Sequence, residues 1–276
     1  YQMSELYLLL KGVLALVVAR LTFNPWLQGY DVGVHWSLWT YGGATLLAAV
    51  ATRLAEKGHS IRPWLEGATL HLLVLFLGTE LRYWLYDGDI FVHEYSLIEA
   101  TMNTLLWGAL SVTYAVRAKA SQSLVWLYRL FSWILLALSS ISYLMLLTLH
   151  NPWWSDGAIG STPIFNMLLP AFGGPVLLAL VISRFPKIAP KLWSLCVAVA
   201  GFLVFTALEI RQLWQGSDMA LWYGMTEGEL YTYSVVGMLY AIAAIIYATV
   251  YSAKSAHIML YKAGMALLGI VIGKIF

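Results

Sequence analysis

The sequence has few charged residues and almost no cysteine. Lys, Arg, Asp and Glu make up 11% of its 276 residues, and Cys196 is the single cysteine. Soluble domains carry about 25% charged residues, so a water-soluble fold of this size would lack a charged surface. One cysteine excludes an intrachain disulfide and a cysteine-rich metal site. A net charge of +2 without a basic cluster also excludes nucleic acid as an expected partner.

Signatures of known soluble catalysis are missing as well. The 6 histidines show no paired metal-ligand spacing, and no Gly-x-Ser-x-Gly elbow, phosphate loop or dinucleotide fingerprint occurs. We therefore predict no metal and no cofactor. The chain begins with Tyr1 rather than Met, and we expect the natural protein to be longer.

Apolar sequence dominates instead. Hydrophobic residues make up 61% of the chain and aromatic residues 14%. A membrane-spanning helix needs about 20 mostly apolar residues, whereas a barrel strand alternates in polarity over about ten. The runs are long and apolar on most faces, so the sequence predicts an all-α, polytopic integral membrane helical bundle with about nine transmembrane helices. The predicted spans are 4–23, 35–55, 63–86, 95–117, 123–149, 163–184, 189–214, 229–252 and 257–276.

Charges in the connecting loops predict the orientation of these spans. Cytoplasmic loops of membrane proteins retain Lys and Arg. One side collects the basic residues Arg53, Lys57, Arg62, Arg117, Lys119, Arg184, Lys187, Lys191 and Lys254, and the other collects the acidic residues Asp31, Asp87, Asp89, Glu94, Asp156, Asp218 and Glu227 among many aromatics. We therefore predict a bacterial cytoplasmic (inner) membrane protein whose acidic, aromatic loops are extracytoplasmic.

Two blocks of the chain match at a displacement of about 130 residues. Four spans separate equivalent positions, and an even number predicts parallel repeats. We predict a first transmembrane repeat over 1–122, a second over 123–254, and an additional helix over 255–276 that begins a third unit or caps the second. The matching pairs are Asn24-Pro25-Trp26 with Asn151-Pro152-Trp153, Glu80-Leu81-Arg82 with Glu209-Ile210-Arg211, Glu99 with Glu229, Thr104 with Ser234, and Tyr128-Arg129 with Tyr261-Lys262.

Ionisable residues at membrane depth are expensive, and they are functional-site hypotheses by default. A Glu and an Arg spaced i and i+2 point to different sides of a helix, so each needs a partner on another helix. We expect ion pairs between Arg82 and Glu99 and between Arg211 and Glu229, which leaves Glu80 and Glu209 free to face a cavity. The predicted ligand-binding residues are Glu80, Arg82, Glu99, Asn103, Glu209, Arg211, Glu229 and Tyr233.

The same residues also have a purely structural interpretation. In it, the ion pairs only fix the register of the helices, and the polar residues along spans four and eight only hold neighbouring helices together. Span six contains Pro163, Pro170 and Pro175 with Gly173 and Gly174, which predicts a kinked or broken helix. Such a break exposes backbone groups to a substrate in transporters, or bends a helix around its neighbours.

The segment Glu229-Leu230-Tyr231-Thr232-Tyr233-Ser234 and the preceding Leu208-Glu209-Ile210-Arg211 carry a family resemblance. With the closing Lys274-Ile275-Phe276, they resemble the bacterial family of predicted multi-pass membrane proteins named domain of unknown function 2339. The resemblance implies a membrane location and repeated units, and it implies that this chain is a piece of a longer one. No established reaction comes with it.

The leading functional hypothesis is transport or binding of an amphiphilic ligand, a lipid or envelope glycan precursor, at an outward-facing site. Duplicated charge beside aromatic outer loops motivates it. The alternatives are a membrane-embedded transferase in envelope assembly, with an outward-facing Glu as general base, and a structural scaffold subunit of a membrane complex. The expected partners are membrane lipids and, for a scaffold, other membrane proteins.

Overall fold

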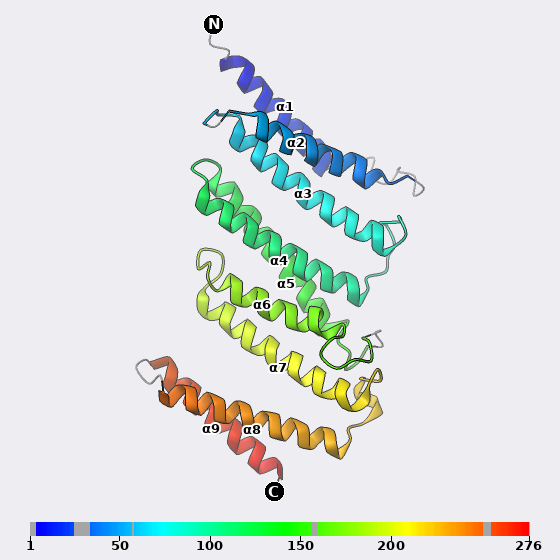
Figure 1. Cartoon of the computed structure of the whole chain (residues 1–276), viewed down its shortest axis with the longest axis vertical. Helices are drawn as coiled ribbons and strands as arrows, with labels where there is room; N and C mark the ends of the chain where they lie inside the picture. The colour runs from blue at the N-terminus through cyan, green and yellow to red at the C-terminus, as the bar shows by residue number, and fades with distance from the viewer. Residues whose placement is uncertain (1–3, 25–33, 57, 156–158, 251–254, 276) are drawn as a thin grey trace. The chain divides into compact units, whose positions relative to one another are not determined.

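In a computed structural model, residues 4–24, 34–56, 58–155, 159–250 and 255–275 are described, and within these ranges the chain is helical without a strand (Figure 1). This confirms the predicted all-α class. The elements are α1 (Ser4–Thr22), the π-helix η2 (Leu38–Gly42), α2 (Gly43–Leu54), α3 (Arg62–Leu85), α4 (Leu97–Ala120), α5 (Val125–Thr148), the π-helix η3 (Leu169–Gly173), α6 (Gly174–Ile182), α7 (Lys191–Gln215), the 3-10 turn η4 (Leu221–Tyr223), α8 (Glu227–Val250) and α9 (Ser255–Ile275).

Each predicted span overlaps one of these α-helices. By length and apolar composition, four helices of the described chain can cross a membrane: α3, α5, α7 and α8. That the other five also span stays a prediction. Several residues used above lie outside the described ranges, namely Pro25, Trp26, Asp31, Lys57, Asp156, Lys254 and Phe276, as does the side chain of Lys274.

The chain forms two compact units. One unit comprises Tyr1–His150 with Pro170–Gly201, and the other comprises Asn151–Leu169 with Phe202–Phe276. One boundary between the units falls within α7, after Gly201, so the units do not coincide with the predicted repeats, which end at 122 and 254. The repeat division is a statement about duplicated sequence, and it stays a prediction.

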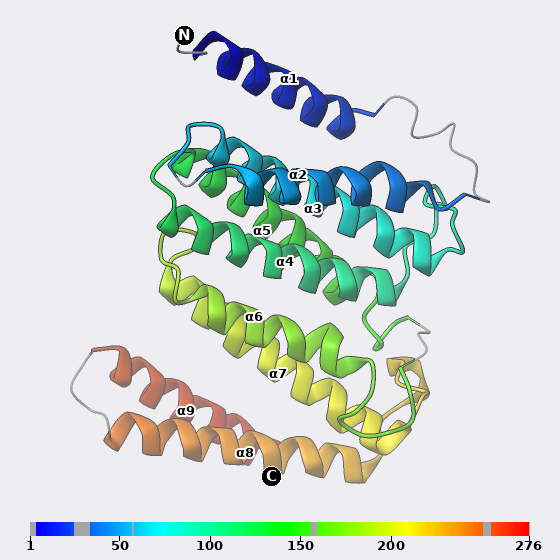
Figure 2. The same cartoon turned by 45° about the horizontal axis from the view of Figure 1, so that its top comes forward.

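The core of the first unit is the antiparallel pair α4 and α5, which a short turn joins (Figure 2). Ser111 Oγ donates to the Ser132 carbonyl at 2.7 Å, and Ser132 Oγ donates back to the Ser111 carbonyl at 2.9 Å. Ser139 Oγ donates to the Thr104 carbonyl at 2.6 Å. Such polar residues lower the hydropathy of α4, but they are buried against α5 and bind the two helices together.

The predicted break in span six is confirmed. Residues 159–167 are not α-helical, and the chain enters α6 through the π-helix η3. Pro175 lies in the first turn of α6, where its missing N–H costs no intrahelical hydrogen bond. The π-helix η2 precedes α2 in the same way, with Gly42 and Gly43 at its end. Single π turns of this kind are frequent at functional sites.

In the second unit, α8 and α9 form another antiparallel pair. Gly264 of α9 makes close contact possible, because a Cβ at this position would lie 3.0 Å from the Ala241 carbonyl oxygen and 2.9 Å from the side chain of Ile245. Small residues at such crossings let membrane helices approach closely. The absence of a side chain at Gly264 therefore lets α9 approach the α8 backbone.

Candidate functional site

The first cluster of predicted site residues joins the end of α3 to the start of α4. Ser96 caps α4, and its Oγ accepts from the backbone N–H of Glu99 at 3.2 Å. The Glu99 side chain is 2% exposed, and its Oε1 lies 3.0 Å from Arg82 Nε. Arg82 also donates to the Val92 carbonyl at 2.7 Å. The expected Arg82–Glu99 pair is therefore confirmed, and it ties the loop after α3 to the first turn of α4.

Tyr86 completes this cluster from just beyond the end of α3. Its hydroxyl donates to Glu99 Oε2 at 2.6 Å, and the Arg82 guanidinium lies over its ring at 5.1 Å from the centroid. Burial and the hydrogen bond to the Glu99 carboxylate both raise the pKa of Tyr86. The phenol thus stays a donor to Glu99, whose charge the α4 N-terminus also favours.

The second cluster, in the other unit, joins α7 to α8 with the same types of contact. Arg211 NH1 lies 2.9 Å from Glu229 Oε1, and both side chains are fully buried. The Arg211 guanidinium also donates to the carbonyls of Met219, Ala220 and Gly224 in the connecting loop. This confirms the second expected pair. Burial of an ion pair is tolerable when hydrogen bonds satisfy the remaining donors, as they do here.

Further members of the second cluster take the places of those in the first. Thr226 Oγ1 accepts from the Glu229 backbone N–H at 3.2 Å, as Ser96 does for Glu99. Gln215 Nε2 donates to Glu229 Oε2 at 3.0 Å, as the Tyr86 hydroxyl does for Glu99. These four residues were missed as site members. Both capping residues begin a Ser/Thr-x-x-Glu pattern, which is a recognised helix-start signal and could have located them.

Glu80 and Glu209, expected to be free to face a cavity, both have hydrogen-bond partners, and of the two Glu80 lines a groove between α3 and α4. Glu80 Oε1 accepts from His35 Nε2 at 2.8 Å and from Trp84 Nε1 at 2.7 Å, and its Oε2 accepts from Ser37 Oγ at 2.8 Å. The reason is that the segment before α2 folds back onto α3. This segment comes early in the chain, and helix periodicity gives no information about it.

Glu209 is held by the segment before α6 in a similar way. Its Oε2 accepts from the Ile164 backbone N–H at 2.9 Å and lies 3.4 Å from Asn166 Nδ2. Its Oε1 is buried, and it accepts no hydrogen bond from the residues that the structure describes. Both carboxylates are thus fixed by residues that immediately precede a π-helix.

The remaining predicted site residues, Asn103 and Tyr233, contact other partners. Asn103 Nδ2 donates to the Tyr95 hydroxyl at 3.3 Å. The Tyr233 hydroxyl donates to the Ala207 carbonyl at 2.9 Å, across to α7. Among the described residues, no hydrogen bond or ion pair joins Asn103 to an Arg–Glu cluster, whereas Tyr233 also interacts with Glu229 and Arg211 of the second cluster.

An apolar groove lies between α3 and α4 beside the first cluster. It has a volume of about 490 Å³, and it is lined by Leu77, Glu80, Leu81, Trp84, Met102, Leu105 and Leu106. Glu80 is the one predicted site residue among these lining residues. The exposed wall is almost entirely apolar, so Glu80 lines it mainly through its side-chain carbons, while its carboxylate is hydrogen-bonded to His35, Ser37 and Trp84.

Metal ligands do not gather in the described residues, where no three His, Cys, Asp or Glu side chains come together. The two ion-pair clusters hold a positive and a negative charge each, so neither leaves the excess negative charge that a cation site needs.

The helical architecture and the four apolar helices agree with what a family comparison finds. The model of one family, described as predicted membrane protein (DUF2339), matches residues 3–276. No curated protein and no solved structure matches the chain. Because the match covers almost the whole sequence and agrees with the resemblance at Glu209–Arg211 and Glu229–Ser234, this chain belongs to the DUF2339 family of predicted membrane proteins.

Proposed function

We propose that this membrane protein consists of two parallel four-helix repeats followed by one further helix, with its acidic loops outside the bacterial inner membrane. The support is the correspondence between the two clusters. Arg82 and Glu99 match Arg211 and Glu229 at almost the same displacement along the chain, with a Ser or Thr cap in each case. Within each repeat, the ion pair ties an outer loop to the start of the following helix.

We further propose that the protein binds an amphiphile, a lipid or an envelope glycan precursor, at the outer groove between α3 and α4. The observation that supports this proposal is a groove of about 490 Å³ with almost entirely apolar walls, whose lining residues include Glu80, a side chain that is 17% exposed. Ligand sites are typically apolar hollows with a few well-placed polar groups. An acyl or polyprenyl chain fits the leucine-lined walls, and its polar head fits the carboxylate.

The hydrogen bonds of Glu80 indicate the chemistry of that head. A carboxylate oxygen has two acceptor positions. Oε1 uses both, for His35 and Trp84, whereas Oε2 accepts only from Ser37 among the described residues. One acceptor position therefore stays open on a carboxylate whose orientation is already fixed. It suits a hydroxyl of a sugar or glycerol, or an ammonium group.

In this proposal the Arg82–Glu99 pair does not contact the ligand. It holds the loop after α3 on the first turn of α4, and so fixes the two helices that line the groove relative to each other. Binding geometry is more precise when such residues are held by a rigid supporting shell.

A photocrosslinker at Met102 tests the proposal. Met102 lines the groove on α4, whereas Val116 is exposed on the same helix outside the groove. In whole membranes, p-benzoylphenylalanine at Met102 is expected to capture an amphiphile of one defined mass, which the Val116 position does not capture. Capture of the same mixture of bulk lipids at both positions would exclude a selective site. Capture of a second protein at Met102 would favour the scaffold alternative.

A second candidate function is a transferase, and one observation favours it. His35 Nε2 lies 2.8 Å from Glu80 Oε1, and the His35 ring stacks on Tyr83 with centroids 3.9 Å apart. A carboxylate that orients an imidazole is a common general-base arrangement. A His35→Gln variant keeps a donor to Glu80, so it would abolish turnover in a transferase but leave the binding of an amphiphile in place.

A further inference from the structure

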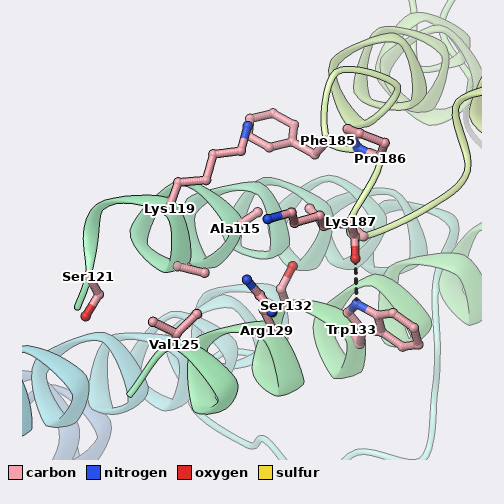
Figure 3. Close-up of a pocket in the computed structure, with 12 residues that line it drawn as sticks. Ala115, Lys119, Ser121, Val125, Arg129, Ser132, Trp133, Phe185, Pro186 and Lys187 are labelled. Carbon is pink, nitrogen blue, oxygen red and sulfur yellow. Dashed lines mark hydrogen bonds between the residues drawn. The ribbon is translucent and has the colours of Figure 1, made fainter. Parts of the chain in front are cut away.

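A second pocket lies at the opposite end of α4 from the groove. It is formed by the turn between α4 and α5 and by the loop that follows α6, and it has a volume of about 430 Å³ (Figure 3). Its walls combine apolar residues with three cations and two serines. The cations are Lys119, Arg129 and Lys187, which come from three separate elements of the same unit.

No acidic residue is among those that line this pocket. Within the described chain, no carboxylate lies within ion-pair distance of its three cations. The neighbouring basic residues differ, because Arg62 and Arg117 both pair with Glu66. Glu66 thus offsets part of the positive charge of Arg62 and Arg117, whereas no carboxylate offsets the charge of the pocket. Three cations that line one hollow without a counter-ion favour an anion.

Two contacts dock the loop after α6 on α4 and α5. Trp133 Nε1 donates to the Lys187 carbonyl at 3.4 Å, and the Lys119 ammonium lies over the Phe185 ring at 4.1 Å from its centroid. In Figure 3, the Arg129 and Lys187 side chains reach into the space between α4, α5 and this loop. The buried Ser132 hydroxyl is already bonded to Ser111, so the cations are the groups available to an anion.

The position of Arg129 places the pocket near a membrane surface. It lies four residues after the first residue of α5, about 6 Å along the helix. The helix α5 is one of the four that can cross a membrane, and Trp126 and Trp133 are exposed on the same two turns. Exposed tryptophans mark the headgroup level of a bilayer, and long basic side chains reach that level from within the span.

We propose that Lys119, Arg129 and Lys187 bind a phosphate group, and that in the membrane this is the phosphate of an anionic phospholipid. Basic pockets between membrane helices suit anionic head groups. The apolar part of the wall, which includes Val125, Trp133 and Ile188, would contact the glycerol and upper acyl region. This site shares no lining residue with the outer groove, so its test is independent of the test of the proposed function.

The test measures binding of tail-labelled fluorescent phosphatidylglycerol to the purified full chain in a neutral detergent. The pocket variant is Arg129→Gln with Lys187→Gln. The matched control is Arg184→Gln with Lys191→Gln, which removes two charges from the same basic end outside the pocket. Each basic residue contributes about fivefold to the binding of an anionic head group, so the pocket variant is expected to bind about 30-fold more weakly. The control is expected to bind like the wild type.

Competitors identify the source of the phosphate. Displacement by unlabelled phosphatidylglycerol, but not by phosphatidylcholine, inorganic phosphate or glycerol 3-phosphate, supports the lipid. Displacement by the soluble phosphates as well supports the phosphate site but assigns it to a soluble ligand. A variant with Arg129→Lys and Lys187→Arg keeps both charges and is expected to bind, which separates lost charge from lost folding. Equal losses in the pocket variant and the control, or no loss in either, would overturn the proposal.

Discussion

Replacement of Arg211 by Met is expected to be one of the most destabilising single changes in this chain. Arg211 and Glu229 are both fully buried, and the guanidinium also holds three loop carbonyls. Removal of one partner of a buried ion pair costs about 3–5 kcal/mol, because a charge is left buried without compensation. Each carbonyl that finds no new donor adds about 1–3 kcal/mol. We therefore expect a loss of at least about 4 kcal/mol in the free energy of unfolding.

The matching change at Arg82 provides the control. The Arg82 side chain is 30% exposed, and the buried Glu99 keeps the Tyr86 hydroxyl as a donor after Arg82→Met, so this change is expected to cost about 1–3 kcal/mol. Denaturation of the purified protein in mixed micelles, followed by circular dichroism, gives both values. Adding Glu229→Met to Arg211→Met should recover part of the loss, because no charge then stays buried. An Arg82→Met variant that is less stable than Arg211→Met would show that full burial of an ion pair does not make its disruption more costly in this protein.

Three further predictions concern packing and pH. Gly78→Ala should destabilise the protein by about 1–3 kcal/mol in the same assay, because a Cβ at this position would lie 2.6 Å from the Trp107 ring. Gly12→Ala is the control and should be neutral or stabilising, because a Cβ there would have no described atom within 4 Å. Ser111→Ala should cost about 0.6 kcal/mol, the typical value for a hydrogen bond between membrane helices; a much larger loss would show that the bond does more than bind α4 to α5. Burial lowers the pKa of His150 below its ordinary value of 6.5. The unfolded chain therefore binds a proton at His150 more readily than the folded protein does, and the folded protein should become less stable as the pH falls below 6.5. A His150→Gln variant whose melting temperature varies with pH as the wild type's does would count against that assignment.

The helices and the ion pairs could be predicted from the sequence, because their signals are local. Apolar runs placed all the α-helices, and the two Glu-x-Arg segments required partners at the start of the next span, where Glu99 and Glu229 were found. A buried charge has few alternatives to an opposite charge nearby, which makes such pairing predictable.

The partners of the two remaining carboxylates could not be predicted. Glu80 and Glu209 are held by the segments before the π-helices, and these segments carry no periodic pattern that fixes their path. The basic pocket was not found for the same reason. Arg129 was visible as a cation within a span, but only the fold of the loop after α6 brings Lys187 to it.

Native mass spectrometry of the full chain, gently extracted from its own membrane, tests whether the outer groove holds an amphiphile at Glu80. The wild type is compared with Glu80→Gln and with Glu94→Gln, which removes one exposed carboxylate from the loop after α3. We expect an amphiphile of defined mass on the wild type and on Glu94→Gln, and its loss from folded Glu80→Gln. An empty wild type, or equal retention by Glu80→Gln, would contradict the proposed site.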